Sequence, residues 1–303
     1  MQTGQFIGIE AGGTKFVLGY GTSPDDLQGR AVIPTEDPET TMKAVVNYIK
    51  DVQKKTKILA IGAAVFGPMD PNPTSPTYGY ITTTPKLGWT HYNFVGRLKQ
   101  DFDLPVGFDT DVNVAAMAEY TWGAARGLSD FIYITVGTGI GAGGMVNGQL
   151  LHGHAHPEMG HILIPHDKQL DPFEGVCPYH KDCLEGLASG PAMKARWNVD
   201  SALDLADSHK AWDLEAHYLG VALSTYTMCL APQKIVMGGG VMRHPNLIER
   251  IKPKLTQALG GYIKTPAVTR DLDRYISLPG LVENSGVCGA IALASAAYRI
   301  AGR

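Results

Sequence analysis

The sequence has no dense cluster of lysine and arginine, and none of its apolar segments approaches the roughly 20 residues that span a membrane. Its net charge is only -3 at neutral pH, whereas a basic patch is the usual electrostatic signature of nucleic-acid binding. The first residues also lack the basic and apolar regions of a secretory signal. These absences argue against nucleic acid and membrane as partners, and they predict a cytoplasmic protein that binds small ligands.

Cysteine is scarce as well: the 303 residues contain four, which argues against a disulfide framework. Two of them, Cys177 and Cys183, flank His180 at regular three-residue steps, and His161 precedes them. Thiolates and imidazoles are the usual ligands of tetrahedral zinc. These four residues therefore predict a zinc site, whose metal would be structural because four protein ligands leave no coordination position open. The alternative is a chance spacing of unrelated core and surface residues.

Two classes of zinc enzyme share parts of this pattern but do not match it. Zinc deaminases pair H-x-E with P-C-x-x-C, whereas the cysteines here follow C-x5-C with a histidine between them. Zinc proteases carry H-E-x-x-H on a helix, whereas residues 156–161 read H-x-E-x-x-H beside a proline and a glycine. The histidines at His152, His154 and His166 are interpreted mostly as loop or surface residues.

Short apolar runs alternate with helical patterns, and 44% hydrophobic with 18% charged residues suits an ordinary globular core. The predicted elements include strands at residues 6–10, 16–20, 58–65 and 106–110 and a helix at residues 112–120. Residues 67–89, rich in proline, threonine and glycine, are predicted to form a surface loop. A strand, a glycine turn and a second strand occur at residues 6–20 and again at 131–148, so we expect a duplicated α/β fold with a cleft between its halves.

The turn of the first hairpin lies in the sequence GIEAGGTKF, with Gly12, Gly13, Thr14 and Lys15 at its tip. Glycines let backbone N–H groups approach an anion, and a nearby hydroxyl or ammonium group can bind phosphate oxygens. The spacing matches neither the Rossmann nor the Walker pattern, because a strand follows the turn instead of a helix. Two interpretations stay open: a plain structural hairpin, or half of a phosphate-binding site formed by two facing hairpins.

Three polar residues, Asp109, Asp111 and Asn113, stand where a predicted strand meets a predicted helix. Asp111 can cap the helix by accepting hydrogen bonds from its first N–H groups. A carboxylate at the C-terminal end of a strand can also take the proton from a substrate hydroxyl that attacks phosphorus. The two roles are compatible, so the sequence leaves both open.

Taken together, these motifs resemble the ROK family of sugar kinases over nearly the whole chain. The matching stretches are GIEAGGTKF and TVGTGIGAG for its two phosphate motifs, TDVN for its catalytic motif, E-x-x-G-H with the cysteine loop for its sugar and zinc signature, and GGGV for its adenosine motif. Within the family, the C-x-x-H-x-x-C loop and the TPKLGW stretch are more similar to bacterial fructokinases than to glucokinases.

The resemblance implies the actin-like ATPase fold, a ribonuclease H-like duplicated α/β fold with two domains and a central cleft. The implied small domain covers residues 1–117 and is joined by a C-terminal helix at about 286–303. The larger domain would cover residues 118–285 and carry the zinc loop. A homodimer is also implied.

The resemblance further assigns roles to individual residues. Asp111 would be the general base for the sugar hydroxyl. The sugar would be held by Glu158, His161 and Glu185, with His161 also bound to zinc through its other ring nitrogen. The ATP phosphates and adenosine would lie near Gly12, Gly13, Thr14, Lys15, Thr138, Gly139, Gly239 and Gly240. The implied cofactors are structural Zn²⁺ and the Mg²⁺ that accompanies ATP.

The implied activity is ATP-dependent phosphorylation of the 6-hydroxyl of D-fructose, and three positions depart from the family pattern. Glu10 stands where an aspartate is usual, and Thr110 and Lys86 stand where the glucose branch has asparagines. The loss of these amides favours a hexose other than glucose. The alternatives are a kinase for mannose, glucose or an amino sugar and, from another class, a non-catalytic sugar-sensing regulator.

Overall fold

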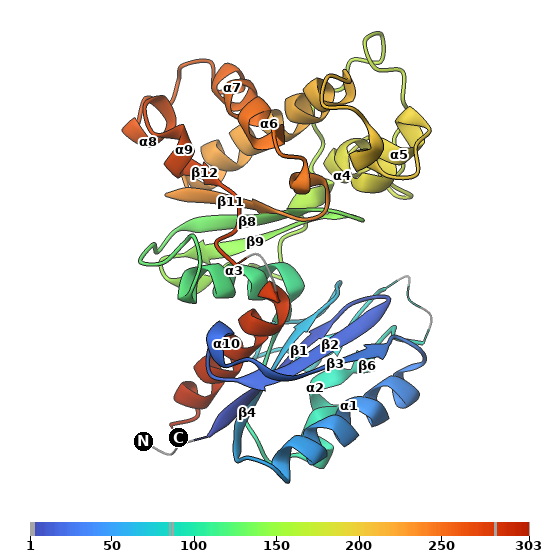
Figure 1. Ribbon diagram of the computed structural model, residues 1–303, viewed down its shortest axis with the longest axis vertical. Helices are drawn as coiled ribbons and strands as arrows, with labels where there is room; N and C mark the ends of the chain where they lie inside the picture. Colours follow the sequence, from blue (N-terminus) through green and yellow to red (C-terminus); the bar gives the residue numbers. More distant parts are fainter. Residues whose placement is uncertain (1–3, 85, 87, 282–283, 303) are drawn as a thin grey trace. The chain divides into compact units, whose positions relative to one another are not determined.

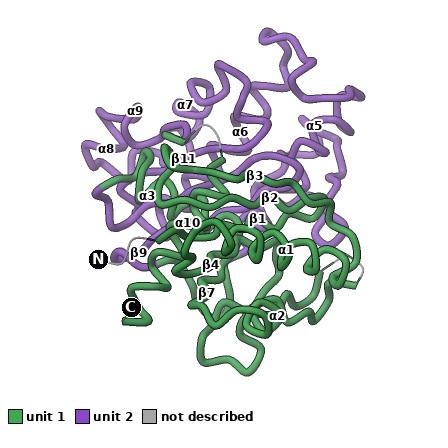
Figure 2. The backbone as a smooth tube through the Cα atoms, turned by 60° about the horizontal axis from the view of Figure 1, so that its bottom comes forward, with its two compact units in different colours: residues 1–126, 150–157, 280–303 green, residues 127–149, 158–279 purple. Residues whose placement is uncertain are grey.

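The computed structural model describes residues 4–302 except 85, 87, 282 and 283. The chain forms two compact units, which Figure 2 shows in different colours. Unit 1 contains residues 1–126, 150–157 and 280–303, and unit 2 contains residues 127–149 and 158–279. The chain therefore leaves unit 1 twice and returns to it twice. Among the described residues, no helix has the length and apolar character needed to cross a bilayer.

Two five-stranded sheets with the same strand order form the centres of the fold (Figure 1). The first has the order β3-β2-β1-β4-β7, and β1 pairs antiparallel with β2 and parallel with β4. The second has the order β10-β9-β8-β11-β12, and β8 pairs antiparallel with β9 and parallel with β11. The strands are β1 Gln5–Ala11, β2 Lys15–Gly21, β3 Gln28–Pro34, β4 Ile58–Val65, β7 Val106–Thr110, β8 Phe131–Val136, β9 Ile140–Val146, β10 Gln149–Leu150, β11 Lys234–Gly238 and β12 Ile276–Ser277. This repetition confirms the predicted duplicated α/β fold.

Helices cover both faces of the first sheet because its strands alternate apolar residues between the two faces. Ile7 and Ile9 of β1 pack with residues of α1 and α2 in the main core of unit 1. Val17 of β2 packs on the other face with Val287 and Ile291 of α10. The elements of unit 1 outside this sheet are α1 Pro38–Gln53, α2 Phe94–Asp101, α3 Asp111–Thr121, α10 Ser285–Ile300, the 3-10 helix η1 Pro24–Asp26 and the short strands β5 Tyr80–Ile81 and β6 Tyr92–Asn93.

A row of glycines crosses the sheet of unit 1 on the face that α10 covers. Gly8 of β1, Gly62 of β4 and Gly107 of β7 are partners in the strand register. A Cβ atom on Gly62 would lie 1.8 Å from the backbone oxygen of Ala290, and one on Gly8 would lie 2.5 Å from that of Val287. The backbone of α10 therefore lies directly on the strands, at a distance that any side chain in this row would prevent.

Unit 2 combines its sheet with helices that follow the cysteine-rich segment. The longest helix of the described chain, α6, packs against α7 and is buried along much of its length. The elements of unit 2 outside the sheet are α4 Leu184–Ala188, α5 Gly190–Trp197, α6 Ala211–Leu230, α7 Leu247–Leu259, α8 Pro266–Thr269, α9 Leu272–Tyr275 and the 3-10 helices η2 Met159–His161, η3 Ala202–Asp204 and η4 Val241–Arg243.

The prediction that residues 67–89 form a surface loop is wrong in part. Met69, Ile81 and Trp89 are buried in the core of unit 1, and the Trp89 indole donates a hydrogen bond to the backbone oxygen of Glu36 at 2.9 Å. Of the TPKLGW stretch, residues 85 and 87 lie outside the described residues. Apolar side chains among the prolines and threonines anchor this segment to the core.

Replacing Gly62 by alanine is expected to destabilise unit 1 by about 1–3 kcal/mol, because the new methyl group would overlap a backbone carbonyl of α10. Urea unfolding followed by circular dichroism measures the change. Gly153→Ala is the matched control, because a Cβ atom there would meet nothing nearer than 3.8 Å. Equal stability of Gly62→Ala and the wild type would contradict the direct contact between α10 and the strands.

Candidate functional site

Asp111 is the first residue of α3, directly after strand β7, and it is exposed. The N-cap of this helix is Thr110, whose hydroxyl accepts a hydrogen bond from the backbone N–H of Asn113 at 3.2 Å. The carboxylate of Asp111 accepts a bond from the N–H of Val112 at 2.9 Å. Thr110 is therefore the N-cap, and Asp111 accepts a bond from a further N–H group of the first turn, so a capping contact and the predicted catalytic role remain compatible.

A buried polar cluster adjoins Asp111. Asp109 is 2% exposed, and its Oδ1 accepts hydrogen bonds from the N–H of Thr110 at 2.8 Å and from Asn113 Nδ2 at 3.0 Å. Its Oδ2 lies 2.8 Å from His152 Nε2, and this bond raises the pKa of His152 against the opposing effect of burial. Asn113 also donates to the backbone oxygen of Leu151 at 3.3 Å. The interpretation of His152 as a loop residue missed this pairing, because its partner lies in a distant part of the sequence.

The first glycine turn is a tight hairpin with an exposed tip. The N–H of Gly12 donates to the backbone oxygen of Lys15 at 3.0 Å, and Thr35 Oγ1 donates to the oxygen of Gly12 at 2.7 Å. Gly13, Thr14 and Lys15 are exposed. The turn is therefore a hydrogen-bonded hairpin whose exposed tip is accessible to an anion.

Glu10 stands at the end of β1 in the environment of Asp111. Burial raises the pKa of Glu10, the charge of Asp111 raises it further, and Lys15 and Arg30 oppose both effects. A Cβ atom on Gly286, in the first turn of α10, would lie 2.3 Å from the carboxyl carbon of Glu10. The glycine therefore leaves the space that this longer acidic side chain occupies.

In unit 2, the turn at residues 137–139 lies close to the turn at residues 239–240, and the two turns contain the four residues of this unit that were predicted to contact ATP. The turn at residues 137–139 joins β8 to β9, and the oxygen of Gly137 accepts a hydrogen bond from the N–H of Gly190 at 2.7 Å. Gly239 follows β11 with φ of 98°, a left-handed conformation that favours glycine. The N–H nitrogen of Gly240 lies 3.8 Å from the position of a Cβ atom on Gly137. The structure thus brings Thr138 and Gly139 close to Gly239 and Gly240.

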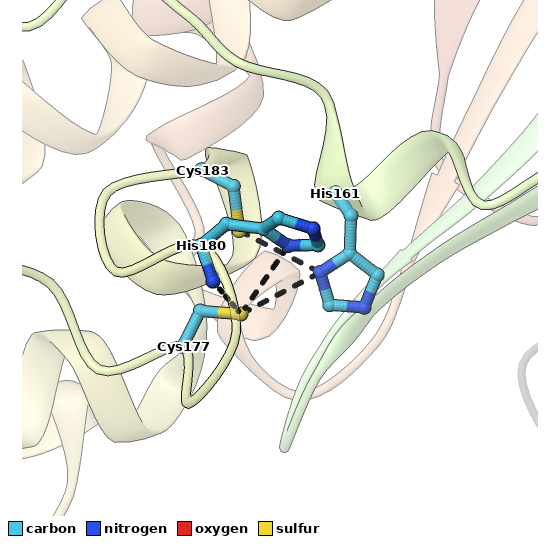
Figure 3. Close-up of side chains that lie close together, drawn as sticks. All are labelled: His161, Cys177, His180 and Cys183. Atoms are coloured by element: carbon cyan, nitrogen blue, oxygen red, sulfur yellow. Dashed lines mark hydrogen bonds between the residues drawn. The ribbon is translucent and has the colours of Figure 1, made fainter.

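The two cysteines and two histidines of the predicted metal site lie together in unit 2 (Figure 3). Their ligand atoms are all within 4.8 Å of one another. His161 Nδ1 lies 3.5 Å from the sulfur of Cys183 and 3.8 Å from that of Cys177, which is 3.7 Å from His180 Nδ1. Zinc at about 2.3 Å from sulfur and about 2.0 Å from nitrogen, in tetrahedral geometry, places sulfur and nitrogen about 3.5 Å apart. The four side chains therefore fit a zinc ion.

The environment of the sulfurs also suits a cation. Cys177 and Cys183 are 2% and 0% exposed, and burial raises the pKa of the Cys183 thiol to about 11. A metal ion replaces the proton of such a thiol and neutralises the thiolate. The loop is held closed by two backbone hydrogen bonds between Cys177 and Lys181, at 3.0 and 3.2 Å.

Two of the predicted sugar ligands, His161 and Glu185, lie side by side. His161 turns Nδ1 toward the sulfurs, and its Nε2 lies 3.9 Å from Oε1 of Glu185. The other carboxylate oxygen of Glu185 accepts a hydrogen bond from the N–H of Ile140 at 2.9 Å. Glu158 is exposed and begins the 3-10 turn that carries His161. Glu185 therefore connects the histidine and cysteine cluster to the turn that contains Thr138 and Gly139.

A second buried network, which the sequence did not indicate, anchors the cysteine loop. The His166 side chain is 4% exposed and lies between Asp182, at 3.1 Å, and the backbone oxygen of Asp171, at 2.9 Å. The carboxylate of Asp171 contacts Arg196 at 3.1 Å and Tyr218 at 2.5 Å. His166 lies in a loop, as one of the two predicted placements has it, but its buried side chain makes the surface placement wrong. No local spacing signals this network, because its members come from two loops and from the helices α5 and α6.

Two sheets with one strand order, each containing an antiparallel hairpin joined by a glycine turn, define the actin-like ATPase fold. The model of the ROK family matches residues 6–297. The chain belongs to the ROK family.

Its relatives include sugar kinases. A Bacillus subtilis protein with a provisional fructokinase name is 46% identical over 292 residues, which cover 96% of each chain. The fructokinase of Zymomonas mobilis is 41% identical over 95% of this chain and 96% of its own. Among solved structures, a ROK hexokinase from Thermus thermophilus has a TM-score of 0.78 at 26% identity, over 98% of this chain and 99% of its own.

His152→Gln is expected to lower the melting temperature more at about pH 6 than at about pH 9. The bond to Asp109 raises the pKa of His152 above its ordinary value of 6.5. The pair therefore stabilises the folded state fully below that ordinary value, and the stabilisation is lost as pH rises through the raised value. Thermal unfolding of wild type and variant at both pH values measures the difference. His154→Gln, in the same segment, is the control, and a difference that grows with pH would contradict the prediction.

Proposed function

We propose that the chain is an ATP-dependent hexose kinase that transfers the γ-phosphoryl group of ATP to the 6-hydroxyl of D-fructose. The observation that carries the proposal is the 41% identity, over nearly the full length of both chains, to a protein named fructokinase. An exposed carboxylate, Asp111, held at the first turn of a helix, supports it as a general base. The glycine turns at residues 12–15, 137–139 and 239–240 are the proposed contacts for the phosphates and adenosine of ATP.

In the proposed reaction, Asp111 accepts the proton of the 6-hydroxyl while the hydroxyl oxygen bonds to the γ-phosphorus. The bond from that phosphorus to the bridging oxygen breaks, and ADP leaves with the electron pair. Glu158, His161 and Glu185 would hold other sugar hydroxyls, so that the reacting oxygen stays oriented. Mg²⁺ bound with ATP would neutralise charge on the phosphates.

The histidine and cysteine cluster is proposed to hold a structural zinc ion. Its support is the set of donor distances and the burial of both sulfurs. Cys177, His180, Cys183 and His161 Nδ1 would occupy all four positions, so the ion would not act on substrate directly. It would fix His161, whose Nε2 stays available on the side of Glu185.

We further propose a homodimer in the cytoplasm. Leu163, Leu170 and Tyr179, which flank or belong to the cysteine loop in the sequence, are 75%, 84% and 78% exposed. Exposed apolar side chains that join into one patch mark protein contacts. None of the four cysteines, all of which lie among the described residues, forms a disulfide, and this suits a reducing compartment. A monomeric mass by light scattering would contradict the dimer.

Asp111→Asn is expected to lower kcat with D-fructose by about 1,000-fold, because the amide cannot accept the hydroxyl proton. ADP release is measured with Mg²⁺ and ATP over D-fructose, D-mannose, D-glucose and N-acetylated hexosamines. Asp103→Asn is the matched control, since Asp103 is an exposed aspartate near the opposite end of β7. Turnover of another hexose alone would reject D-fructose, and sugar binding without turnover would favour a sugar-sensing regulator.

Cys183→Ser is expected to lose the zinc ion and to lower the melting temperature by more than about 5 °C, because a structural metal contributes directly to folding. Metal analysis of the purified chain should give about one zinc per chain for the wild type and for Cys229→Ser. Cys229 is the control because it is an exposed cysteine on α6. Wild-type protein that is folded and active without zinc would contradict this proposal.

A further inference from the structure

The segment at residues 150–157 belongs to unit 1, although the residues on both sides of it belong to unit 2. Side-chain hydrogen bonds attach it at both ends. Near its start, His152 Nε2 lies 2.8 Å from Asp109 Oδ2. Near its end, His156 Nε2 accepts a hydrogen bond from the N–H of Met69 at 3.3 Å. The segment then continues directly into Glu158, a proposed sugar ligand.

The contact at His152 involves a carboxylate that is almost fully buried. Asp109 is 2% exposed, and a buried charge requires a paired charge or several hydrogen bonds. Its Oδ1 accepts hydrogen bonds from Thr110 and Asn113, while its Oδ2 lies next to His152 Nε2. The imidazole therefore provides the second carboxylate oxygen with a hydrogen-bond donor and, when protonated, with the opposite charge.

The residues that form these bonds lie on both sides of Asp111 in the sequence. Asp109 holds the N–H of Thr110 on one side of it, and Asn113 stands on the other side. The amide of Asn113 is held by Asp109 and by the backbone oxygen of Leu151, which immediately precedes His152. The direction of the first turn of α3 thus depends on the segment that carries His152.

We propose that His152 is a positioning residue for Asp111: its Nε2 lies 2.8 Å from Asp109 Oδ2 and 3.2 Å from Asn113 Nδ2, and through these two residues it orients the carboxylate that accepts the sugar proton. This inference rests on the proposed kinase function for its catalytic consequence. A displacement of about 1 Å of a reacting group can cost about 100-fold in rate, so a loosened first turn lowers kcat. Substrate affinity changes little, because His152 itself does not hold the substrate.

The test compares His152→Gln with wild type in two independent measurements, steady-state kinetics and hydrogen exchange of the backbone amides at residues 110–114. The expected result is a fall in kcat of about tenfold or more, with KM for D-fructose changed by less than about threefold. Faster amide exchange at residues 110–114 is expected as well. His154→Gln, an exposed histidine in the same segment, should resemble wild type in both measurements.

A double variant separates positioning from stability. In Asp109→Asn with His152→Gln, two neutral amides restore a hydrogen bond and leave no buried charge, so kcat should recover in part. The proposal is overturned if His152→Gln keeps kcat within about twofold of wild type. It is also overturned if kcat falls only in proportion to the folded fraction. If wild type phosphorylates no hexose, the kinase proposal fails, while amide exchange still decides whether His152 orders the first turn of α3.

Discussion

Close backbone contact at glycines is the constraint on which both units depend. In unit 1, Gly8, Gly62 and Gly107 let α10 lie directly on the strands, so the last helix of the chain completes a core that the first strands begin. In unit 2, a Cβ atom on Gly160 would lie 1.6 Å from the backbone oxygen of Ile140. The turn that carries Glu158 and His161 therefore packs against the start of β9.

Hydrogen bonds hold the elements that carry the proposed functional side chains. Asp111 begins a helix whose cap and neighbouring polar groups are all hydrogen-bonded. Glu185 is held by the N–H of Ile140, next to a glycine turn. Phosphoryl transfer depends on positioning more than on covalent chemistry, so rigid support of this kind suits the proposed reaction. Zinc would add the same kind of restraint to His161.

The sequence was informative wherever the signal is local. Strand β4 was predicted at residues 58–65 and β7 at residues 106–110, and both lie there, because apolar runs bounded by turn residues mark buried strands. The spacing of Cys177, His180 and Cys183 indicated a cluster that the structure shows. The buried residues among 67–89 were not predicted. Proline and threonine content indicates an irregular backbone, but it does not indicate whether a side chain such as Trp89 packs into the core.

By itself the sequence determined the α/β class and the residues that stand at each turn, since both depend on local residue patterns. It also determined the duplication and the family, since both depend on the order of short motifs along the chain. Only the tertiary structure decided which residues, distant in the sequence, form ion pairs or hydrogen bonds with one another. It paired His152 with Asp109, placed His166 between Asp171 and Asp182, and returned residues 150–157 to unit 1. Such pairings follow from burial, because a carboxylate removed from water must find its partner wherever the folded chain provides one.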